Sequence, residues 1–371
     1  MQNIKIISPL HIGNGLKYPN YLIQANKKYE FEKILELAFK KNKSTLLSNE
    51  FLKMLSTTNA SASGEAKKQL AELFSPTTKE LETIDFEYQI KMACPKINQL
   101  DIYENIKTNS KLMIPGSSLK GYIINVIMFD VIKNNSEIRN WYKANLSNKR
   151  EVERVEREVF TLSNQKLICR DVVFDDEPIV VLISRISKKG PMPVVYECIQ
   201  KDTFKKDEFI LINNLALNPK VEFKNNISYV IYKEISNRIV NIKNLFQKMN
   251  KDFVLNALKY EEAFIKNIPY EKDFDKKSAL NQIADLRNKL ENNKIIMQLG
   301  KNTNYIVKSA GHAFDENFYR TRFYDFFNPG KDPKKAKDIA KPYVIGSMNI
   351  VSSAEFENYE EIPGFVEIEW L

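Results

Sequence analysis

Three short segments of the chain combine glycine with hydroxyl, amide or lysine side chains. They read HIGNG at residues 11–15, IPGSSLKG at 114–121 and LGKNTNY at 299–305. We expect each at a strand-to-helix junction, where accessible backbone N–H groups and a nearby ammonium group attract anions. This residue chemistry predicts contacts to phosphate groups.

The second segment carries the most specific form of this prediction. Ser117 or Ser118 is a natural N-cap for a helix that begins there, and Lys120 then falls in the first turn, within reach of a phosphate. The segment is not a Walker A loop, because Gly121 follows the lysine and no Lys-Ser or Lys-Thr pair closes it. ATP hydrolysis is therefore disfavoured.

Histidine and cysteine are too scarce for a metal centre or a disulfide framework. The histidines are His11 and His312, and the three cysteines, Cys94, Cys169 and Cys198, form no CxxC pair. We therefore predict no metal and no cofactor, and a reducing, cytoplasmic location. His11 could act as a general base, but a histidine that hydrogen-bonds within its loop or stacks on a base is the simpler interpretation.

Acidic, aromatic and basic stretches leave further alternatives open. The acidic residues of 171–177 could hold a divalent cation, although DDEP at 175–178 is more simply a turn. Residues 314–327, rich in Phe and Tyr with two arginines, could stack bases or form a helical core face. The lysine-rich stretch 331–341 could follow a phosphate backbone or form a solvated loop.

Hydropathy patterns predict the elements that position the three segments. A strand precedes Pro9, a helix begins near residue 31, a helix that is apolar almost all round follows Ser117, and 56–68 is an exposed polar loop. Further strands are expected within 167–217, 294–300, 344–350 and 365–371, and long helices within 230–267 and 276–290.

Strands, then helices, then strands, in two rounds, indicate an α+β fold of two ferredoxin-like (RRM-like) units with additional helices. We place the first unit, with inserted helices, at residues 1–217 and a helix-rich second unit at 218–371.

The charge balance agrees with an anionic partner but does not establish one. Lys and Arg number 56 against 47 for Asp and Glu, a net charge of +9, which makes nucleic acid plausible. The abundance of Lys, Asn and Ile can produce the same balance without any ligand. The chain has no apolar run of 18 residues, so we expect no membrane association.

The order and separation of four motifs resemble the RAMP superfamily of CRISPR-associated RNA-binding proteins. The motifs are SPLHIGNG at 8–15, IPGSSLKG, LGKNTNY and the late KPYVIGSMNI at 341–350. Within the superfamily they are most similar to the family of subunits that cap the backbone of the type III-A Csm effector complex. IPGSSLKG is the most distinctive of the four.

The resemblance implies a non-catalytic subunit that binds CRISPR RNA near its 3′ end, caps the filament and supports guide maturation and antiviral defence. Its expected partners are CRISPR RNA and other Csm subunits, above all the repeated backbone subunit, with host nucleases as further candidates. The RNA-contacting residues implied are His11, Gly13, Asn14, Gly15, Gly116, Ser117, Ser118, Lys120, Gly121, Gly300, Lys301, Asn302, Thr303 and Lys308.

The chain departs from the family pattern at two places. After Gly121 it continues with Tyr122, where the family usually has small residues and an arginine, and the third segment has one glycine where the family often has two.

Two other functions are weighed against the leading one. Because related enzymes of the same fold process CRISPR RNA with a histidine, the alternative is a metal-independent endoribonuclease with His11 as general base and Lys120 stabilising charge. A third interpretation is a scaffold whose long helices recruit nucleases.

Overall fold

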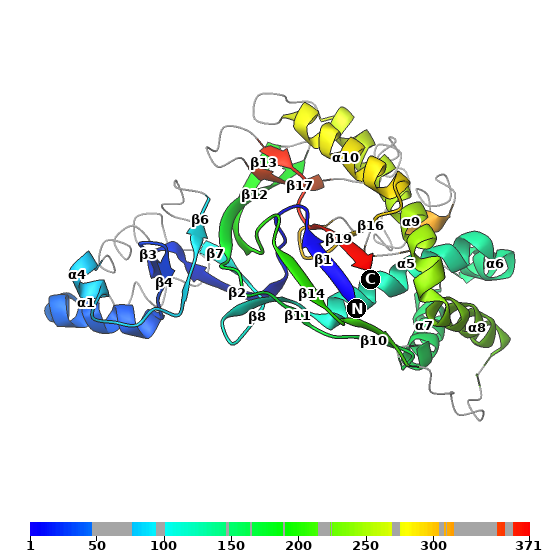
Figure 1. The fold of residues 1–371 in the computed structure, drawn as a ribbon, viewed down its shortest axis with the longest axis horizontal. Coiled ribbons are helices and arrows are strands. Elements are labelled where there is room, and N and C mark those ends of the chain that lie inside the picture. Colours follow the sequence, from blue (N-terminus) through cyan, green and yellow to red (C-terminus); the bar gives the residue numbers. More distant parts are fainter. Residues whose placement is uncertain are drawn as a thin grey trace.

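The computed structural model describes residues 1–46, 76–93, 101–145, 148–163, 165–187, 190–213, 223, 225–268, 275–303, 308, 310–314, 347–352 and 359–371 (Figure 1). The polar stretch 56–68, Cys94, the aromatic stretch beyond residue 314 and the lysine-rich stretch 331–341 lie outside these ranges. None of the helices within them is long and apolar enough to cross a membrane.

The helices are α1 (Phe31–Leu46), α4 (Thr78–Leu81), α5 (Gly116–Asn134), α6 (Ser136–Asn145), α7 (Lys149–Ser163), α8 (Asn226–Val240), α9 (Ile242–Lys266) and α10 (Lys276–Glu291). Short 3-10 helices cover η1 (Asn20–Leu22) and η3 (Gly311–Ala313). The strands are β1 (Gln2–Ile6), β2 (Gly13–Pro19), β3 (Ile23–Gln24), β4 (Lys27–Lys28), β5 (Tyr88–Gln89), β6 (Lys91–Met92), β7 (Asp101–Asn105), β8 (Lys107–Thr108), β9 (Lys111–Ile114), β10 (Leu167–Cys169), β11 (Val172–Val173), β12 (Ile179–Ser187), β13 (Gly190–Cys198), β14 (Phe204–Asp207), β15 (Ile210–Ile212), β16 (Ile295–Gln298), β17 (Ser347–Ser352), β18 (Tyr359–Glu361) and β19 (Phe365–Trp370).

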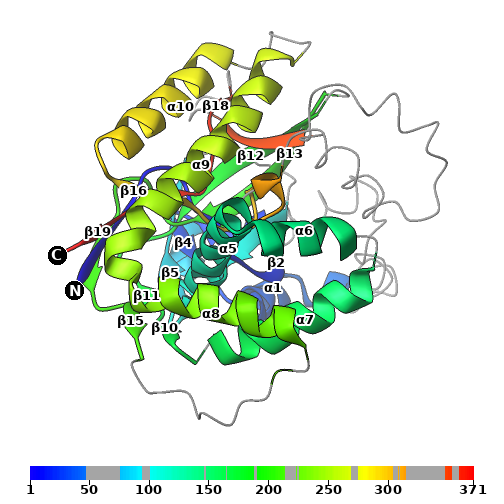
Figure 2. The same cartoon turned by 90° about the vertical axis from the view of Figure 1, so that its right-hand side faces the viewer.

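The first large sheet joins the two ends of the chain. Its order is β14-β1-β19-β16, and every pair in it is antiparallel. Ile4 and Ile6 of β1 and Val366 and Ile368 of β19 are buried on its inner side, as their alternation with polar residues predicts. Figure 2 shows the helices in front of the strands, so the helical layer covers that inner side.

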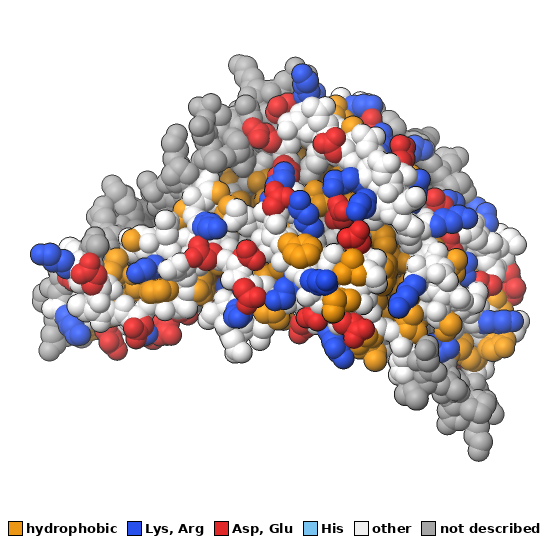
Figure 3. All heavy atoms as spheres, viewed as in Figure 1, with side chains coloured by type: hydrophobic (Ala, Val, Ile, Leu, Met, Phe, Trp, Pro, Cys, Tyr) orange, Lys and Arg blue, Asp and Glu red, His pale blue; other side chains and the backbone are white. Residues whose placement is uncertain are grey.

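The outer surface of the molecule seen in Figure 3 carries both signs of charge intermixed. Ion pairs such as Lys5 with Asp202 at 2.8 Å and Lys289 with Glu367 at 2.7 Å neutralise lysines near the first sheet. The net positive charge of the chain therefore does not mark this surface as a nucleic-acid site.

The second large sheet also takes strands from distant parts of the chain. Its order is β18-β17-β12-β13-β7-β2, and β6 pairs with the start of β12. Both large sheets contain strands from each side of residue 217, so that boundary does not separate one sheet from the other. The division into 1–217 and 218–371 stays a prediction, whereas the mixed α+β content is confirmed.

Helix α5 lies at the centre of the main core. Its apolar residues are buried around most of its circumference, and Tyr122 and Phe129 each make an edge contact with Phe253 of α9, with ring centroids 5.6 and 5.4 Å apart. This confirms the predicted buried helix. Its neighbours are mainly helices α6, α8 and α9 together with β10.

Within the described ranges, the other predicted strands and long helices are present with local differences. The helical stretch 230–267 is broken at Asn241 into α8 and α9. From the first segment to α1 the chain forms β2, the short 3-10 helix η1 and the two-residue strands β3 and β4. Strands β3, β4 and β5 with α1 form an arm, seen at the left of Figure 1. Its apolar residues share one cluster with Ile102, Val180, Leu182 and Val195 of the second large sheet.

Candidate nucleic-acid interface

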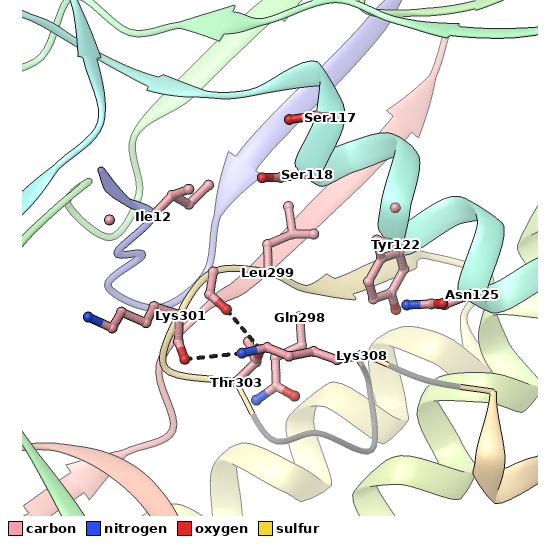
Figure 4. Close-up of a pocket in the computed structure, with 13 residues that line it drawn as sticks. Ile12, Ser117, Ser118, Tyr122, Asn125, Gln298, Leu299, Lys301, Thr303 and Lys308 are labelled. Carbon is pink, nitrogen blue, oxygen red and sulfur yellow. Dashed lines mark hydrogen bonds between the residues drawn. The ribbon is translucent and has the colours of Figure 1, made fainter. Parts of the chain in front are cut away.

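The three glycine-containing segments meet at one cleft, although they are far apart in the sequence. The cleft has a volume of about 340 Å³. The residues that line it are Ile12, Gly13, Ser117, Ser118, Gly121, Tyr122, Asn125, Gln298, Leu299, Gly300, Lys301, Thr303 and Lys308 (Figure 4). Over the described residues the lining contains two lysines, three hydroxyl groups of Ser or Thr, and no carboxylate.

The first and third segments are joined by their backbones. The Lys301 N–H donates to the His11 carbonyl at 3.0 Å. Gly300 makes this approach possible, because it adopts a φ of +93° and a Cβ at its position would come within 2.3 Å of the His11 oxygen. A glycine is therefore required at residue 300 by both conformation and space.

Two lysines supply the positive charge of the cleft. Figure 4 shows Lys308 reaching across the third segment, where its Nζ donates to the Lys301 carbonyl at 3.2 Å. Thr303 Oγ1 closes the same turn by donating to the Gly300 carbonyl at 2.9 Å. Desolvation lowers the pKa of Lys308, and the positive charge of Lys301 lowers it further. A bound anion would relieve this repulsion.

The start of α5 differs from the predicted capping. Pro115 is the N-cap residue, in an extended conformation, so neither Ser117 nor Ser118 caps the helix. The Gly116 N–H donates to the Asp171 carboxylate at 2.7 Å, which places one of the chain's own negative charges at the helix start. A Cβ on Gly116 would lie 2.1 Å from the Cys169 carbonyl oxygen, so Gly116 serves close packing.

One side of α5 faces the cleft. Ser117, Gly121 and Asn125, spaced four residues apart, lie on this side with Ser118 and Tyr122. Lys120 does not line the cleft. Its charge acts instead on Cys169, opposing the burial that raises the pKa of that thiol to about 12.

His11 lies behind the cleft and is almost fully buried. Its Nδ1 is 2.8 Å from the Glu197 carbonyl, and its ring packs on Tyr196 with centroids 4.7 Å apart. A Cβ on Gly13 would come within 2.8 Å of His11 Nε2, so the ring is covered from the cleft side. Burial lowers the pKa of His11 to about 4. A general base must reach the proton it removes, so this geometry disfavours His11 as a catalyst.

The first segment leads into strand β2, not into a helix as predicted. Asn14 lies on this strand outside the cleft, where its Nδ2 donates to Glu104 at 2.9 Å and its Oδ1 accepts from the Leu16 N–H at 2.8 Å. Gly15 has a φ of +91° and open space around its Cβ position. Both residues shape the bulged start of β2.

Asn302 also supports the cleft without lining it. Its side chain is 6% exposed, and its carbonyl accepts a hydrogen bond of 2.9 Å from Asn349 Nδ2 on β17. This contact holds the third segment against the second large sheet.

Two of the acidic residues considered as metal ligands have other partners in the structure. Asp171 binds the start of α5, and Asp175 pairs with Lys111 at 2.6 Å and Lys205 at 3.0 Å. Hydrogen bonds from these two lysines lower the pKa of Asp175 to about 2. Within the described parts of the chain, no group of three or more His, Cys, Asp or Glu side chains is placed to hold a metal ion.

Sequence reasoning missed several cleft residues, namely Ile12, Tyr122, Asn125, Gln298 and Leu299. The four-residue spacing from Ser117 through Gly121 to Asn125 could have identified Asn125, because it keeps small and polar residues on one side of an otherwise apolar helix. Gln298 carries a comparable signal as a polar residue that ends an apolar strand.

Comparison with solved structures shows the same fold. One chain of a cryo-EM structure of a Csm–crRNA–target RNA ternary complex, from a type III-A CRISPR-Cas system, matches with a TM-score of 0.67 and 19% identity over 99% of both chains. The crystal structure of T. onnurineus Csm5 matches with a TM-score of 0.61 and 17% identity, over 99% of this chain and 100% of Csm5.

A search of the curated proteins gives no significant match. The family model of the RAMP superfamily, however, matches residues 3–305. This range contains the three segments that form the cleft and most of the chain, and the chain therefore belongs to the RAMP superfamily.

Proposed function

We propose that this chain is a non-catalytic RNA-binding subunit of a type III-A CRISPR (Csm) effector complex. It caps the backbone filament near the 3′ end of the CRISPR RNA and supports guide maturation and antiviral defence in the cytoplasm. The observation that carries the proposal is the convergence of the three segments on a cleft with two lysines and no carboxylate among its described lining residues. The fold similarity to Csm subunits supports the choice of complex.

The cleft has the chemistry of a phosphate and sugar site. Ammonium, hydroxyl and backbone N–H groups bind phosphate oxygens without reading a base. A guide-binding subunit has to accept many spacer sequences, so contacts of this kind suit it. We include CRISPR RNA and the other Csm subunits, above all the repeated backbone subunit, as partners. Two ferredoxin-like units, 1–217 and 218–371, remain part of the proposal through the family resemblance.

Paired lysine substitutions test the cleft. At about 4 Å, one charge pair contributes about 1 kcal/mol in water, so K301A/K308A should lose about 2 kcal/mol, or roughly 30-fold in affinity. The slope of log K against log salt should fall by about 1.4 for single-stranded RNA. The matched control is K233A/K243A, which removes the same charge from exposed positions of α8 and α9 outside the cleft.

The measurement is filter binding or fluorescence anisotropy with a CRISPR repeat RNA and an unrelated RNA of equal length. We expect K301A/K308A to lower the affinity for both RNAs equally and K233A/K243A to change either affinity little. Equal losses for the two variants, or a loss confined to one RNA sequence, would contradict the cleft as the RNA site. Co-expression with the other Csm subunits tests the assembly, where the chain should co-elute with a ladder of RNAs that share a fixed 5′ end.

The endoribonuclease alternative has a direct test. Wild-type protein and His11→Ala are incubated with repeat RNA in EDTA, and products are examined for 2′,3′-cyclic phosphate ends. The buried position of His11 leads us to expect no cleavage by either protein. Cyclic-phosphate products that disappear in the variant would establish the enzyme instead.

A further inference from the structure

A pair of stacked tyrosines lies on one face of the second large sheet. Tyr103 of β7 is the register partner of Tyr196 of β13, and the rings stack with centroids 5.3 Å apart and planes inclined by 29°. Lys17 of β2 is the register partner of Tyr103 on its other side. Because register partners in a sheet point to the same face, these three side chains form one row across the sheet.

Lys301 connects this row with the cleft. Its Nζ lies 4.3 Å from the centre of the Tyr103 ring. Figure 4 shows the Lys301 side chain, which lines the cleft, extending away from Lys308. Lys301 therefore contacts both the cleft and the Tyr103 ring, which does not itself line the cleft.

Buried residues support this row of side chains from below. Tyr196 is 9% exposed and rests on the buried ring of His11, whose carbonyl in turn accepts the Lys301 N–H. Tyr103 itself is partly exposed, and Lys17 is exposed and paired with Asp101 at 2.5 Å. The buried Tyr196 and His11 therefore hold the row in place, while Tyr103 remains partly accessible to a ligand.

The Lys301 ammonium group that lies over the Tyr103 ring interacts with it only weakly. A cation over an exposed aromatic ring contributes about 0.5–1 kcal/mol, whereas a nucleobase stacked on an aromatic ring contributes about 1–3 kcal/mol. A phosphate bound in the cleft would attract the Lys301 ammonium away from the Tyr103 ring. One nucleotide can therefore place its base on that ring while its phosphate pairs with Lys301.

We propose that Tyr103, backed by Tyr196, is a base-stacking residue that binds the nucleobase adjacent to the phosphate held in the cleft. Lys17 and Lys301 flank the base and contact its neighbouring phosphates. The contact accepts any base, because every base presents an aromatic face. This inference rests on the proposed RNA-binding function and adds the place of one base to it.

The test combines protein variants with RNAs that lack a single base. Tyr103→Leu removes the aromatic ring and Tyr103→Phe keeps it, while Tyr229→Leu on α8, 49% exposed, is the matched control. Tyr103→Leu should lose roughly 5- to 150-fold in affinity, the equivalent of one stacked base. Tyr103→Phe and Tyr229→Leu should bind like wild type.

A scan of abasic positions along the RNA measures the energetic coupling between Tyr103 and each base. In wild-type protein, one abasic position should reduce affinity by the same factor as Tyr103→Leu, and that position should cause no further loss in the variant. The scan with wild-type protein gives an answer even if Tyr103→Leu fails to fold. A 2-aminopurine at the same position should be quenched on binding to wild type.

The outcomes separate this inference from the proposed function. If K301A/K308A weakens RNA binding but no abasic position does, the stacking role of Tyr103 is wrong and the phosphate cleft stands. If the abasic loss and the Tyr103→Leu loss simply add, the base stacks elsewhere and the inference is overturned. If wild-type protein binds no RNA, the proposed function itself fails.

Discussion

Replacing Gly300 by alanine tests the contact that joins the first and third segments of the cleft. The chain offers matched controls, because four glycines combine the two possible obstacles differently. Gly300 has both a positive φ and a close neighbour, Gly15 has the positive φ alone, Gly116 has the close neighbour alone, and Gly121 has neither. Alanine at the four positions therefore separates backbone strain from steric overlap.

The magnitudes follow from these environments. A non-glycine residue at positive φ costs about 1–2 kcal/mol, which is the whole effect expected for Gly15→Ala. Overpacking costs about 1–3 kcal/mol, which applies to Gly116→Ala. Gly300→Ala incurs both and also strains the 3.0 Å hydrogen bond from Lys301 to His11, worth about 1 kcal/mol. Gly121→Ala, within a helix, should stabilise by roughly 0.5–1 kcal/mol.

Urea unfolding measures the four free energies, with an unchanged m-value required for the comparison. We expect the order Gly121→Ala, Gly15→Ala, Gly116→Ala, Gly300→Ala from most to least stable, with Gly300→Ala about 3–6 kcal/mol below wild type. If Gly300→Ala is no less stable than Gly15→Ala, the third segment does not pack against the His11 carbonyl and the described cleft is wrong.

Three further predictions address the charges. Burial lowers the pKa of His11 from 6.5 to about 4, so the unfolded chain binds more protons between these values and stability should fall by about 3 kcal/mol as the pH drops through that window. His312, whose pKa burial lowers to about 3, adds a similar loss over the same window, for about 7 kcal/mol in all. His11→Asn should therefore remove about half of the total, and an unchanged pH dependence would contradict the burial of His11. Lys301→Ala should raise the pKa of Lys308 by removing a like charge, which a lysine NMR titration can detect, and an unaltered titration would place the two groups apart. Lys107→Met leaves the fully buried Glu197, whose carboxylate lies 2.7 Å from the Lys107 ammonium, without a counter-ion. The free energy of unfolding in urea should fall by about 3–5 kcal/mol, whereas a loss below 1 kcal/mol would argue against that ion pair.

Local patterns predicted much of the secondary structure. The apolar residues all round the helix after Ser117 predicted α5, and the alternation at 365–371 predicted β19. In such stretches the spacing of apolar residues follows the period of burial in the element. The break at Asn241 was not predicted, since apolar residues continue across it without a proline or glycine.

The candidate site could be predicted only in part. Residue types identified the three segments, but their meeting depends on β1 pairing with β19 and on the Lys301 to His11 bond, which no local pattern reports. Lys120 and His11 show the limit most clearly. Both have suitable side chains for RNA chemistry, yet the rotation of α5 and the packing on Tyr196 turn them away from the cleft.

The closing strand of the first sheet also has a consequence for the order of folding. β1 lies between β14 and β19, and the Leu299 N–H donates to the carbonyl of Gly364, the residue just before β19. Contacts between residues so distant in sequence form slowly. We expect a nascent chain to form the complete cleft only after β19 has been synthesised, so that the RNA binding proposed above awaits completion of the sheet.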